Sequence, residues 1–261
     1  MVNDRVRKTI GRWLPGLPGW VRRQQRRFGI HWPPQGRVGF GDLRRTTPIS
    51  RAFGLDRGQH ISRYYIEQFL EQHAALIQGR VLEFGDAFYT QHFGGGRVTK
   101  SDVLNVVPGA AATTFVGDLT QADFIPSGIF DCIVYTQTLQ MIYDFRAALR
   151  HLERILKPGG ALLITTHGTS QIGRYEGVDA WGEYWHFTSQ SMVRLANEFF
   201  PPPNVSFRSY GNVLSAVAHL HGLTAGDVTR EELDQHDPAY EVIIGVVAIK
   251  RVNEKTAGDR G

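Results

Sequence analysis

The feature that most constrains the fold is an alternation of strand-like runs with segments of helical periodicity between residues 60 and 250. The expected strands occupy residues 80–84, 97–102, 113–116, 130–135, 161–166, 205–210 and 241–250. Apolar residues recur at helical spacing over residues 60–78, 145–156, 189–200 and 214–220. Because strands that alternate with helices form doubly wound sheets, these runs predict an α/β, Rossmann-like fold: a mostly parallel seven-stranded sheet with helices on both faces.

Domain boundaries follow from this pattern and from the distribution of charge. The formal net charge of +4 divides unevenly, because residues 1–51 carry twelve Lys and Arg against two acids. We therefore expect a basic N-terminal extension and lid at residues 1–59, one domain at 60–252 and a tail at 253–261. A short basic helix is expected at residues 21–28 within the extension.

The basic extension has three interpretations. Trp13 and Trp20 among arginines fit peripheral contact with an anionic membrane surface. Binding of nucleic acid is a second interpretation, and packing against a second subunit, as in a homodimer, is a third. The rest of the chain has a net negative charge and no matching basic groove, so nucleic acid is the least favoured of the three.

Cysteine usage and hydropathy indicate the compartment. Cys132 is the single cysteine, which excludes an internal disulfide and a multi-cysteine zinc site. The apolar run over residues 242–249 is far shorter than the roughly 20 residues that a membrane-spanning helix needs. The N-terminus has no uninterrupted apolar core of the kind found in secretion signals. We expect a soluble, cytoplasmic protein.

Acidic side chains follow three neighbouring strands of the expected sheet. They are Glu83 and Asp86 around Gly85, then Asp102, then Asp118. A glycine lets the backbone approach a ligand, and an acid about 20 residues further on can accept hydrogen bonds from ribose hydroxyls. A third carboxylate could accept a hydrogen bond from the amine of adenine. The alternative is that each acid caps a turn, but the shared spacing favours a nucleoside-type ligand.

Two segments then carry a resemblance to a known family. Residues 130–137, and residues 147–165 with the turn Leu156-Lys-Pro-Gly-Gly160, resemble the second half of a class I S-adenosylmethionine-dependent methyltransferase. The resemblance covers residues 60–250 and implies S-adenosylmethionine as the cofactor. It implies that Glu83, Gly85, Asp86, Thr136 and Gln137 lie near the methionine end, that Asp102 holds the ribose, and that Asp118 with Leu119 faces the adenine.

The loop after the first strand departs from the family's pattern. The family normally has two or three glycines at alternate positions, whereas this chain has Gly85 alone before Asp86-Ala87-Phe88-Tyr89. The crossover from Gly85 to Gly96 is near the minimum length for such a unit. A non-catalytic binding protein on the same fold is therefore one alternative. A methyltransferase that acts on RNA or protein is another.

Residues 44–65 resemble a subset of these enzymes that is found beside sugar-modifying and glycosyl-transfer genes. The resemblance implies that the segment folds over the strand ends as a lid. Asp56, Arg57 and Tyr64 would then touch cofactor or substrate. The alternative is a solvated loop whose Asp–Arg pair contributes little.

Methyl transfer from a sulfonium is an in-line displacement that needs positioning, and a base when the acceptor is a hydroxyl. His167 and His186 are the candidate catalytic bases because imidazole has the most suitable pKa; packing and capping are their alternative roles. Either histidine could instead join Asp179 or Glu183 around magnesium. Because the sequence lacks the carboxylate-rich spacing that such a hard cation prefers, no metal is expected. His219 and His221 are expected to be structural.

The candidate substrate-binding residues are Tyr64, Gln140, Trp181 and Tyr184. Aromatic faces with interspersed polar groups, as in residues 181–188, suit a sugar or polycyclic substrate. We therefore expect an O-methyltransferase that acts on a small molecule: a sugar, a glycan or a secondary metabolite.

Overall fold

The computed structural model describes residues 36–109, 112–173 and 182–252. By its contacts the chain divides between Thr46 and Thr47 into two units. The described part of the first unit has a 3₁₀ turn at Gly41–Leu43. The helix expected at residues 21–28 lies outside the described residues. All features below belong to the second unit.

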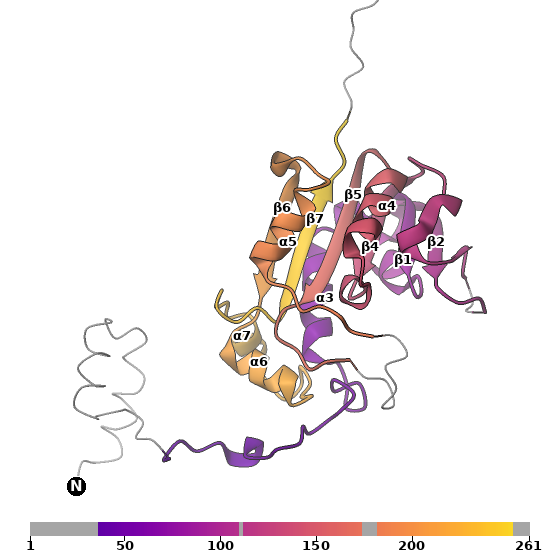
Figure 1. The fold of residues 1–261 in the computed structure, drawn as a ribbon. Coiled ribbons are helices and arrows are strands. Elements are labelled where there is room, and N and C mark those ends of the chain that lie inside the picture. The colour runs from indigo at the N-terminus through magenta and orange to yellow at the C-terminus, as the bar shows by residue number, and fades with distance from the viewer. Residues whose placement is uncertain (1–35, 110–111, 174–181, 253–261) are drawn as a thin grey trace, which may run out of the picture. The chain divides into compact units, whose positions relative to one another are not determined.

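The second unit is built on one seven-stranded sheet in the order β3-β2-β1-β4-β5-β7-β6. The strands are β1 (Gly79–Phe84), β2 (Val98–Asn105), β3 (Phe115–Val116), β4 (Phe130–Thr136), β5 (Leu156–His167), β6 (Val205–Tyr210) and β7 (Ile243–Ile249). β7 runs antiparallel to both of its neighbours, and the other pairs are parallel. The predicted mostly parallel, seven-stranded α/β fold is confirmed (Figure 1).

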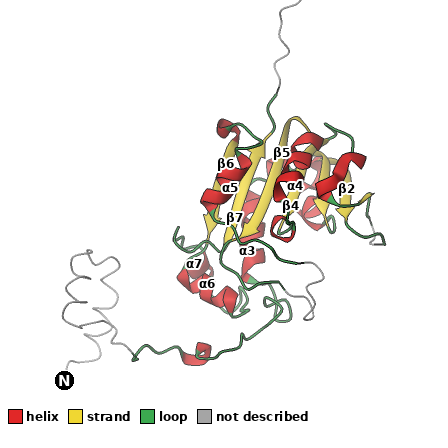
Figure 2. Ribbon diagram, viewed as in Figure 1, coloured by secondary structure: helices red, strands yellow, loops and turns green. Residues whose placement is uncertain are grey.

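Helices cover both faces of this sheet (Figure 2). The helices over the faces are α3 (Ile61–Gln72), α4 (Phe145–Ile155) and α5 (Ser189–Ala196). Two further helices, α6 (Val213–Leu220) and α7 (Arg230–Leu233), lie beyond the end of the sheet, where α6 contacts both α3 and α7 (Figure 1). Side chains of α4 and α5 belong to one apolar core, and side chains of α3 and α6 belong to the other. No helix among the described residues is long and apolar enough to cross a membrane.

The central strand, β4, explains why helices are needed on both sides. Side chains alternate between the faces of a strand, so Ile133 and Tyr135 of β4 join the core under α4, whereas Cys132 and Val134 join the core under α3. All four side chains are fully buried. A strand that is apolar on both faces is stable only when both faces are covered.

Candidate active site

The carboxyl ends of the parallel strands meet at one edge of the sheet. β1, β4 and β5 are consecutive neighbours, so the segments that follow Phe84, Thr136 and His167 lie side by side. β6 also ends at this edge, because it runs antiparallel to β7, as β5 does. Ligands of doubly wound sheets bind beyond such an edge, and the candidate site is therefore built from the residues that follow these strands.

Glu83, near the end of β1, caps the short helical segment after the strand. It is 2% exposed, and its carboxylate accepts the backbone N–H of Tyr89 at 3.0 Å and of Thr90 at 2.7 Å. Burial raises the pKa of this carboxyl, and the hydrogen bonds from Thr90 oppose that shift. The carboxylate of Glu83 thus holds the backbone of this loop, and its place near the methionine end stays a prediction.

Gly85 gives the loop after β1 its conformation. Its φ of +85° lies in the region that favours glycine, and the space that a Cβ would occupy is open. Asp86 beside it is exposed and accepts the Phe88 N–H at 2.8 Å. The short crossover contains a π-helical turn at Thr90–Gly94 and a 3₁₀ turn at Gly95–Arg97. An open backbone beside an exposed carboxylate fits the approach of the amino-acid end of S-adenosylmethionine.

The position predicted for Asp102 is wrong. Asp102 does not end β2 but lies inside it, paired in register with Leu82 of β1. Its side chain is fully buried and accepts a hydrogen bond from Arg80 Nε at 2.6 Å, with Lys100 Nζ at 3.7 Å. A fully buried carboxylate that is paired with an arginine of the neighbouring strand has no exposed face for a ribose.

Asn105 occupies the end of β2 where the ribose-binding acid was expected. It is half-buried, and its Nδ2 donates to Gly85 O at 3.1 Å and to Thr113 Oγ1 at 2.7 Å. These bonds leave the amide oxygen free to accept a hydrogen bond. Asn105 was not identified from the sequence, because an acid was expected at the end of β2. The available signal was the run Val103-Leu104, which continues the strand past Asp102.

Asp118 follows β3 as predicted, and the structure also gives it a capping role. Its carboxylate accepts the Thr120 N–H at 2.8 Å at the start of a 3₁₀ segment, Leu119–Phe124. Asp118 is exposed, so part of its carboxylate faces outward. Leu119 is 4% exposed and packs in the apolar core. Leu119 was predicted to face the adenine with Asp118, whereas its side chain lies in the core.

Gln137 follows Thr136, the last residue of β4, with a left-handed φ of +49°. Its Nε2 donates to Thr165 Oγ1 at 3.3 Å, and its Oε1 accepts from Gln140 Nε2 at 3.2 Å. These two bonds fix which way the amide points. The Oε1 atom also lies 3.1 Å from Nδ1 of His167. Gln137 therefore joins the end of β4 to the end of β5.

Gln140 ties the loop over residues 182–188 to the end of β4. Its backbone oxygen accepts the N–H groups of Tyr184 at 2.9 Å and Trp185 at 3.2 Å. Its side chain is 3% exposed, so the prediction that it contacts substrate is corrected to a positioning role. Tyr184 is 55% exposed, and its ring meets Tyr143 edge-on at 5.4 Å between centroids. Trp181, a third predicted substrate contact, lies outside the described residues.

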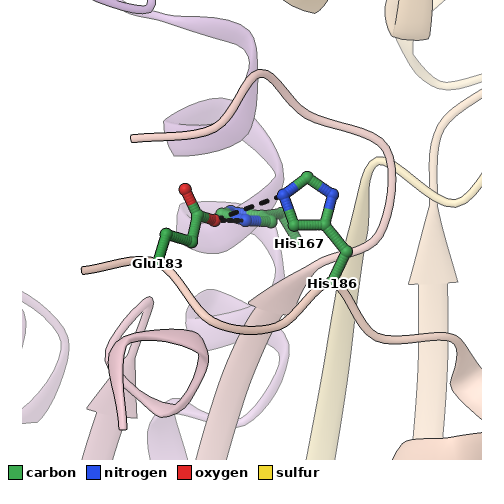
Figure 3. Close-up of side chains that lie close together, drawn as sticks. All are labelled: His167, Glu183 and His186. Carbon is green, nitrogen blue, oxygen red and sulfur yellow. Dashed lines mark ion pairs between the residues drawn. The ribbon is translucent and has the colours of Figure 1, made fainter. Parts of the chain in front are cut away.

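Three side chains converge beyond the ends of β4 and β5 (Figure 3). His167 is the last residue of β5, and Glu183 and His186 come from the loop before α5. Glu183 Oε1 contacts His167 Nε2 and lies 3.4 Å from His186 Nε2. Glu183 Oε2 accepts the N–H of Gly173. The two predicted catalytic histidines are thus brought together by a carboxylate.

Burial alone would raise the pKa of the Glu183 carboxyl. Hydrogen bonds from His167 and from the Gly173 N–H, and the charges of the two histidines, outweigh it and hold the pKa below its usual value. The side chain of Glu183 is 5% exposed and that of His167 is 9% exposed, whereas His186 is 34% exposed. The cluster therefore presents one buried anionic oxygen and one imidazole that solvent or substrate can reach.

The segment after Thr47 packs at the same edge of the sheet. The N–H groups of Ile49 and Ser50 donate to His221 O, and Gln171 Nε2 donates to Arg51 O at 3.0 Å. Asp56 accepts a hydrogen bond from the Ser50 hydroxyl. Gln171 follows β5, so the segment lies beside the strand ends, where a lid was predicted.

The polar side chains of this region are already engaged within the fold. Arg57 pairs with Asp227 at 3.3 Å. The Tyr64 hydroxyl donates to Asp234 at 2.7 Å, and burial, followed by this bond, raises the pKa of Tyr64 to about 12. The prediction that Tyr64 binds substrate is corrected, because its hydroxyl holds the end of α7 against α3.

His219 of α6 is structural, as predicted, and it should make stability depend on pH. It is 1% exposed, and burial lowers its pKa from 6.5 to about 4. The unfolded chain therefore binds the extra proton first, so the free energy of unfolding should fall by about 3 kcal/mol as the pH drops from 6.5 to 4. Urea denaturation across this range measures the slope. His219→Gln should flatten it, and exposed His236→Gln should not; an unchanged slope in His219→Gln would refute the assignment.

Comparison with known proteins gives the family. A family model described as a methyltransferase domain matches residues 62–202, more than half of the chain. A search of curated proteins gave no match. Similar solved structures include the [4+2]-cyclase SpnF, with 15% identity over 76% of this chain and 85% of that one and a TM-score of 0.50. At this identity the likeness shows the fold alone.

Two further solved structures are similar at lower scores. The YcgJ protein of Bacillus subtilis has 15% identity over 73% of this chain and 100% of that one, with a TM-score of 0.46. The N-methyltransferase NodS of Bradyrhizobium japonicum has 15% identity over 74% and 97%, with a TM-score of 0.45. The family match, the strand order and the open loop at Gly85 agree with one another. The chain belongs to the methyltransferase-domain family and is a class I methyltransferase that uses S-adenosylmethionine as its methyl donor.

Proposed function

We propose that this enzyme transfers the methyl group to a hydroxyl oxygen of a sugar, glycan or related secondary metabolite. The observation that carries the proposal is the convergence of His167, Glu183 and His186 beyond β4 and β5. A hydroxyl must lose its proton as it attacks the sulfonium methyl, and it needs a group nearby that draws the proton away. A neutral amine has its own lone pair and has less need of such a group.

The cofactor would be held by residues that the structure leaves accessible at the ends of β1, β2 and β3. The open backbone at Gly85 and the carboxylate of Asp86 would hold the methionine end. Asn105 would accept a hydrogen bond from a ribose hydroxyl, and Asp118 would accept one from the adenine amine. S-adenosylmethionine supplies an activated methyl group when bound, and the protein supplies position.

The acceptor would enter on the side of His186 and Tyr184, the exposed members of the loop over residues 182–188. Tyr184 and Tyr143 present exposed aromatic rings there. Such rings give flat apolar surfaces with polar rims, which suit the faces of a sugar ring. Glu183 and His186 would then meet the hydroxyl that is to be methylated.

Mass spectrometry of acceptor mixtures tests this function. The enzyme is incubated with S-adenosylmethionine and matched pairs of acceptors, each a hydroxyl compound and its amino analogue. We expect one added methyl group on the hydroxyl compounds, with sugars preferred. Methylation of the amino analogues alone would contradict the proposal.

Asn105 offers a test of the cofactor site. Asn105→Ala should raise the Kd for S-adenosylhomocysteine about tenfold, because one hydrogen bond to the ribose and the tether to Gly85 are lost. Asn105→Asp keeps an acceptor for the ribose hydroxyls but loses the donor to Gly85 O, so its Kd should lie between those of the wild type and Asn105→Ala. Asn204→Ala is the matched control, since Asn204 bonds to Ile249 O at 3.2 Å, next to the carboxyl end of β7. Calorimetry measures all four proteins, and equal Kd values for Asn105→Ala and the control would remove Asn105 from the site.

A further inference from the structure

In the contact between His167 and Glu183, the assignment of hydrogen-bond donors and acceptors depends on which ring nitrogen of His167 carries the proton. His167 Nδ1 faces Gln137 Oε1 in the amide orientation in which Gln137 also donates to Thr165 and accepts from Gln140. Because an amide oxygen can only accept, Nδ1 carries the N–H and donates. In the neutral imidazole the lone pair is then on Nε2 and points at Glu183 Oε1, which is also an acceptor; only a second proton, on Nε2, turns this contact into the charged hydrogen bond that lowers the pKa of Glu183.

His186 repeats the same arrangement from the other side. Its Nε2 lies 3.4 Å from the same carboxylate oxygen, and its ring meets the His167 ring at 4.8 Å between centroids (Figure 3). When the His167 imidazole is neutral, the buried atoms His167 Nε2 and Glu183 Oε1 face each other with no hydrogen-bond donor between them. Three atoms that can bind a metal thus converge within 4.8 Å of one another, and either a proton on an imidazole or a metal ion among them would balance the charge of the carboxylate.

The atoms around the cluster match the surroundings of a metal site. A histidine ligand usually donates its second ring N–H to an oxygen acceptor, which fixes the tautomer; His167 does so to Gln137. The second oxygen of Glu183 is held by the Gly173 N–H. Three protein ligands with open positions are typical of catalytic metal sites, and His186, at 34% exposure, leaves a side open to solvent.

We propose that His167 Nε2, His186 Nε2 and Glu183 Oε1 bind a divalent transition-metal ion. Two imidazoles and one carboxylate suit zinc, iron, cobalt or nickel, whereas magnesium prefers a shell of oxygens. The ion would occupy the space between the three atoms, and the contact between His167 and Glu183 would open to admit it. Of the described residues, these are the three that offer ligand atoms to one another in this way.

This metal site extends the proposed function, and the role of the ion in catalysis rests on that function. A bound cation would take an acceptor hydroxyl as a further ligand, hold it before the methyl group and lower its pKa. Metal binding itself does not depend on which acceptor is methylated, so the two proposals can fail separately.

Zinc binding to protein without a histidine tag tests the site. Metal is removed with a chelator, Zn²⁺ is restored by dialysis, and metal content and calorimetric Kd are measured. We expect one ion per chain in the wild type, and a Kd at least about tenfold higher in Glu183→Gln and His186→Gln. His236→Gln is the control, because His236 is exposed and contacts Ser209 instead. Gln137→Ala should weaken binding less than loss of a ligand does.

A second measurement needs no substitution. Co²⁺ in the wild type should give visible absorption bands of a four- or five-coordinate ion, and Zn²⁺ should remove them by competition. Failure of the wild type to take up an ion, or equal affinity in wild type, Glu183→Gln and His186→Gln, would overturn the proposal. Hydroxyl methylation without zinc binding would leave the proposed function standing alone. Zinc binding together with methylation of amines only would support the metal site and contradict the proposed function.

Discussion

Replacing Glu183 with glutamine is expected to lower kcat for methyl transfer by about 10²- to 10⁴-fold while leaving the Kd for S-adenosylhomocysteine unchanged within about twofold. The reason is that Glu183 is the one anionic group at the centre of the cluster, contacted by His167 and by His186. Glutamine keeps the size and the bond from Gly173 but removes the charge. Initial-rate assays at saturating cofactor measure the effect.

The matched control for this substitution is Glu198→Gln. Glu198 is also paired, through Arg146 at 2.8 Å, but the pair is exposed and lies on α4 and the end of α5. Its loss should leave kcat unchanged and cost little stability. A Glu183→Gln enzyme with wild-type kcat, or one that has lost cofactor binding as well, would show that the cluster does not activate the acceptor.

The second large effect is on stability. Arg80→Leu should lower the free energy of unfolding by about 3 to 5 kcal/mol, because it leaves the buried carboxylate of Asp102 without its main partner. Lys100, which is 3.7 Å away and exposed, compensates only in part. The double variant Arg80→Leu/Asp102→Leu should regain most of the loss, since neither charge is then buried alone. Urea denaturation measures all three proteins.

Arg146→Leu serves as the comparison for the Arg80 variant. It breaks an exposed ion pair and should cost much less stability than the loss of Arg80. If Arg80→Leu cost no more than Arg146→Leu, or if the double variant were less stable than the single one, Asp102 would not be a buried structural carboxylate. The assignment of the ribose contact to Asn105 would then have to be reconsidered.

The central strands could be predicted from sequence because they are apolar runs that are buried on both faces, and the partly exposed edge strand β6 could be predicted as well. β6 has the predicted bounds, and β4 differs by one residue. The error at β2 has a physical cause. Thr99, Lys100, Ser101 and Asp102 are polar, which suggested an end, whereas the strand continues because Arg80 on β1 neutralises Asp102. That pairing depends on the register between two strands, which local sequence does not contain.

The candidate site could be predicted only where it depends on the ends of strands, and not where it depends on tertiary contacts. His167 could be placed at a strand end, and His186 could be placed in an aromatic loop. Their meeting at Glu183 depends on where the residues before α5 lie, and that position is set by tertiary bonds such as those from Tyr184 and Trp185 to Gln140. The orientation of Gln137, which fixes the tautomer of His167, likewise depends on a left-handed φ that glutamine rarely adopts.

The most direct test of the account is a crystal structure of the enzyme with S-adenosylhomocysteine and a hydroxyl acceptor. The central claim is that methyl transfer takes place between the loop at Gly85 and the cluster of His167, Glu183 and His186. We predict that the ribose meets Asn105, that the sulfur points across the end of β4, and that the acceptor hydroxyl lies between the sulfur and Glu183–His186. A complex in which the sulfur faces away from these side chains, with the acceptor bound elsewhere, would contradict the account.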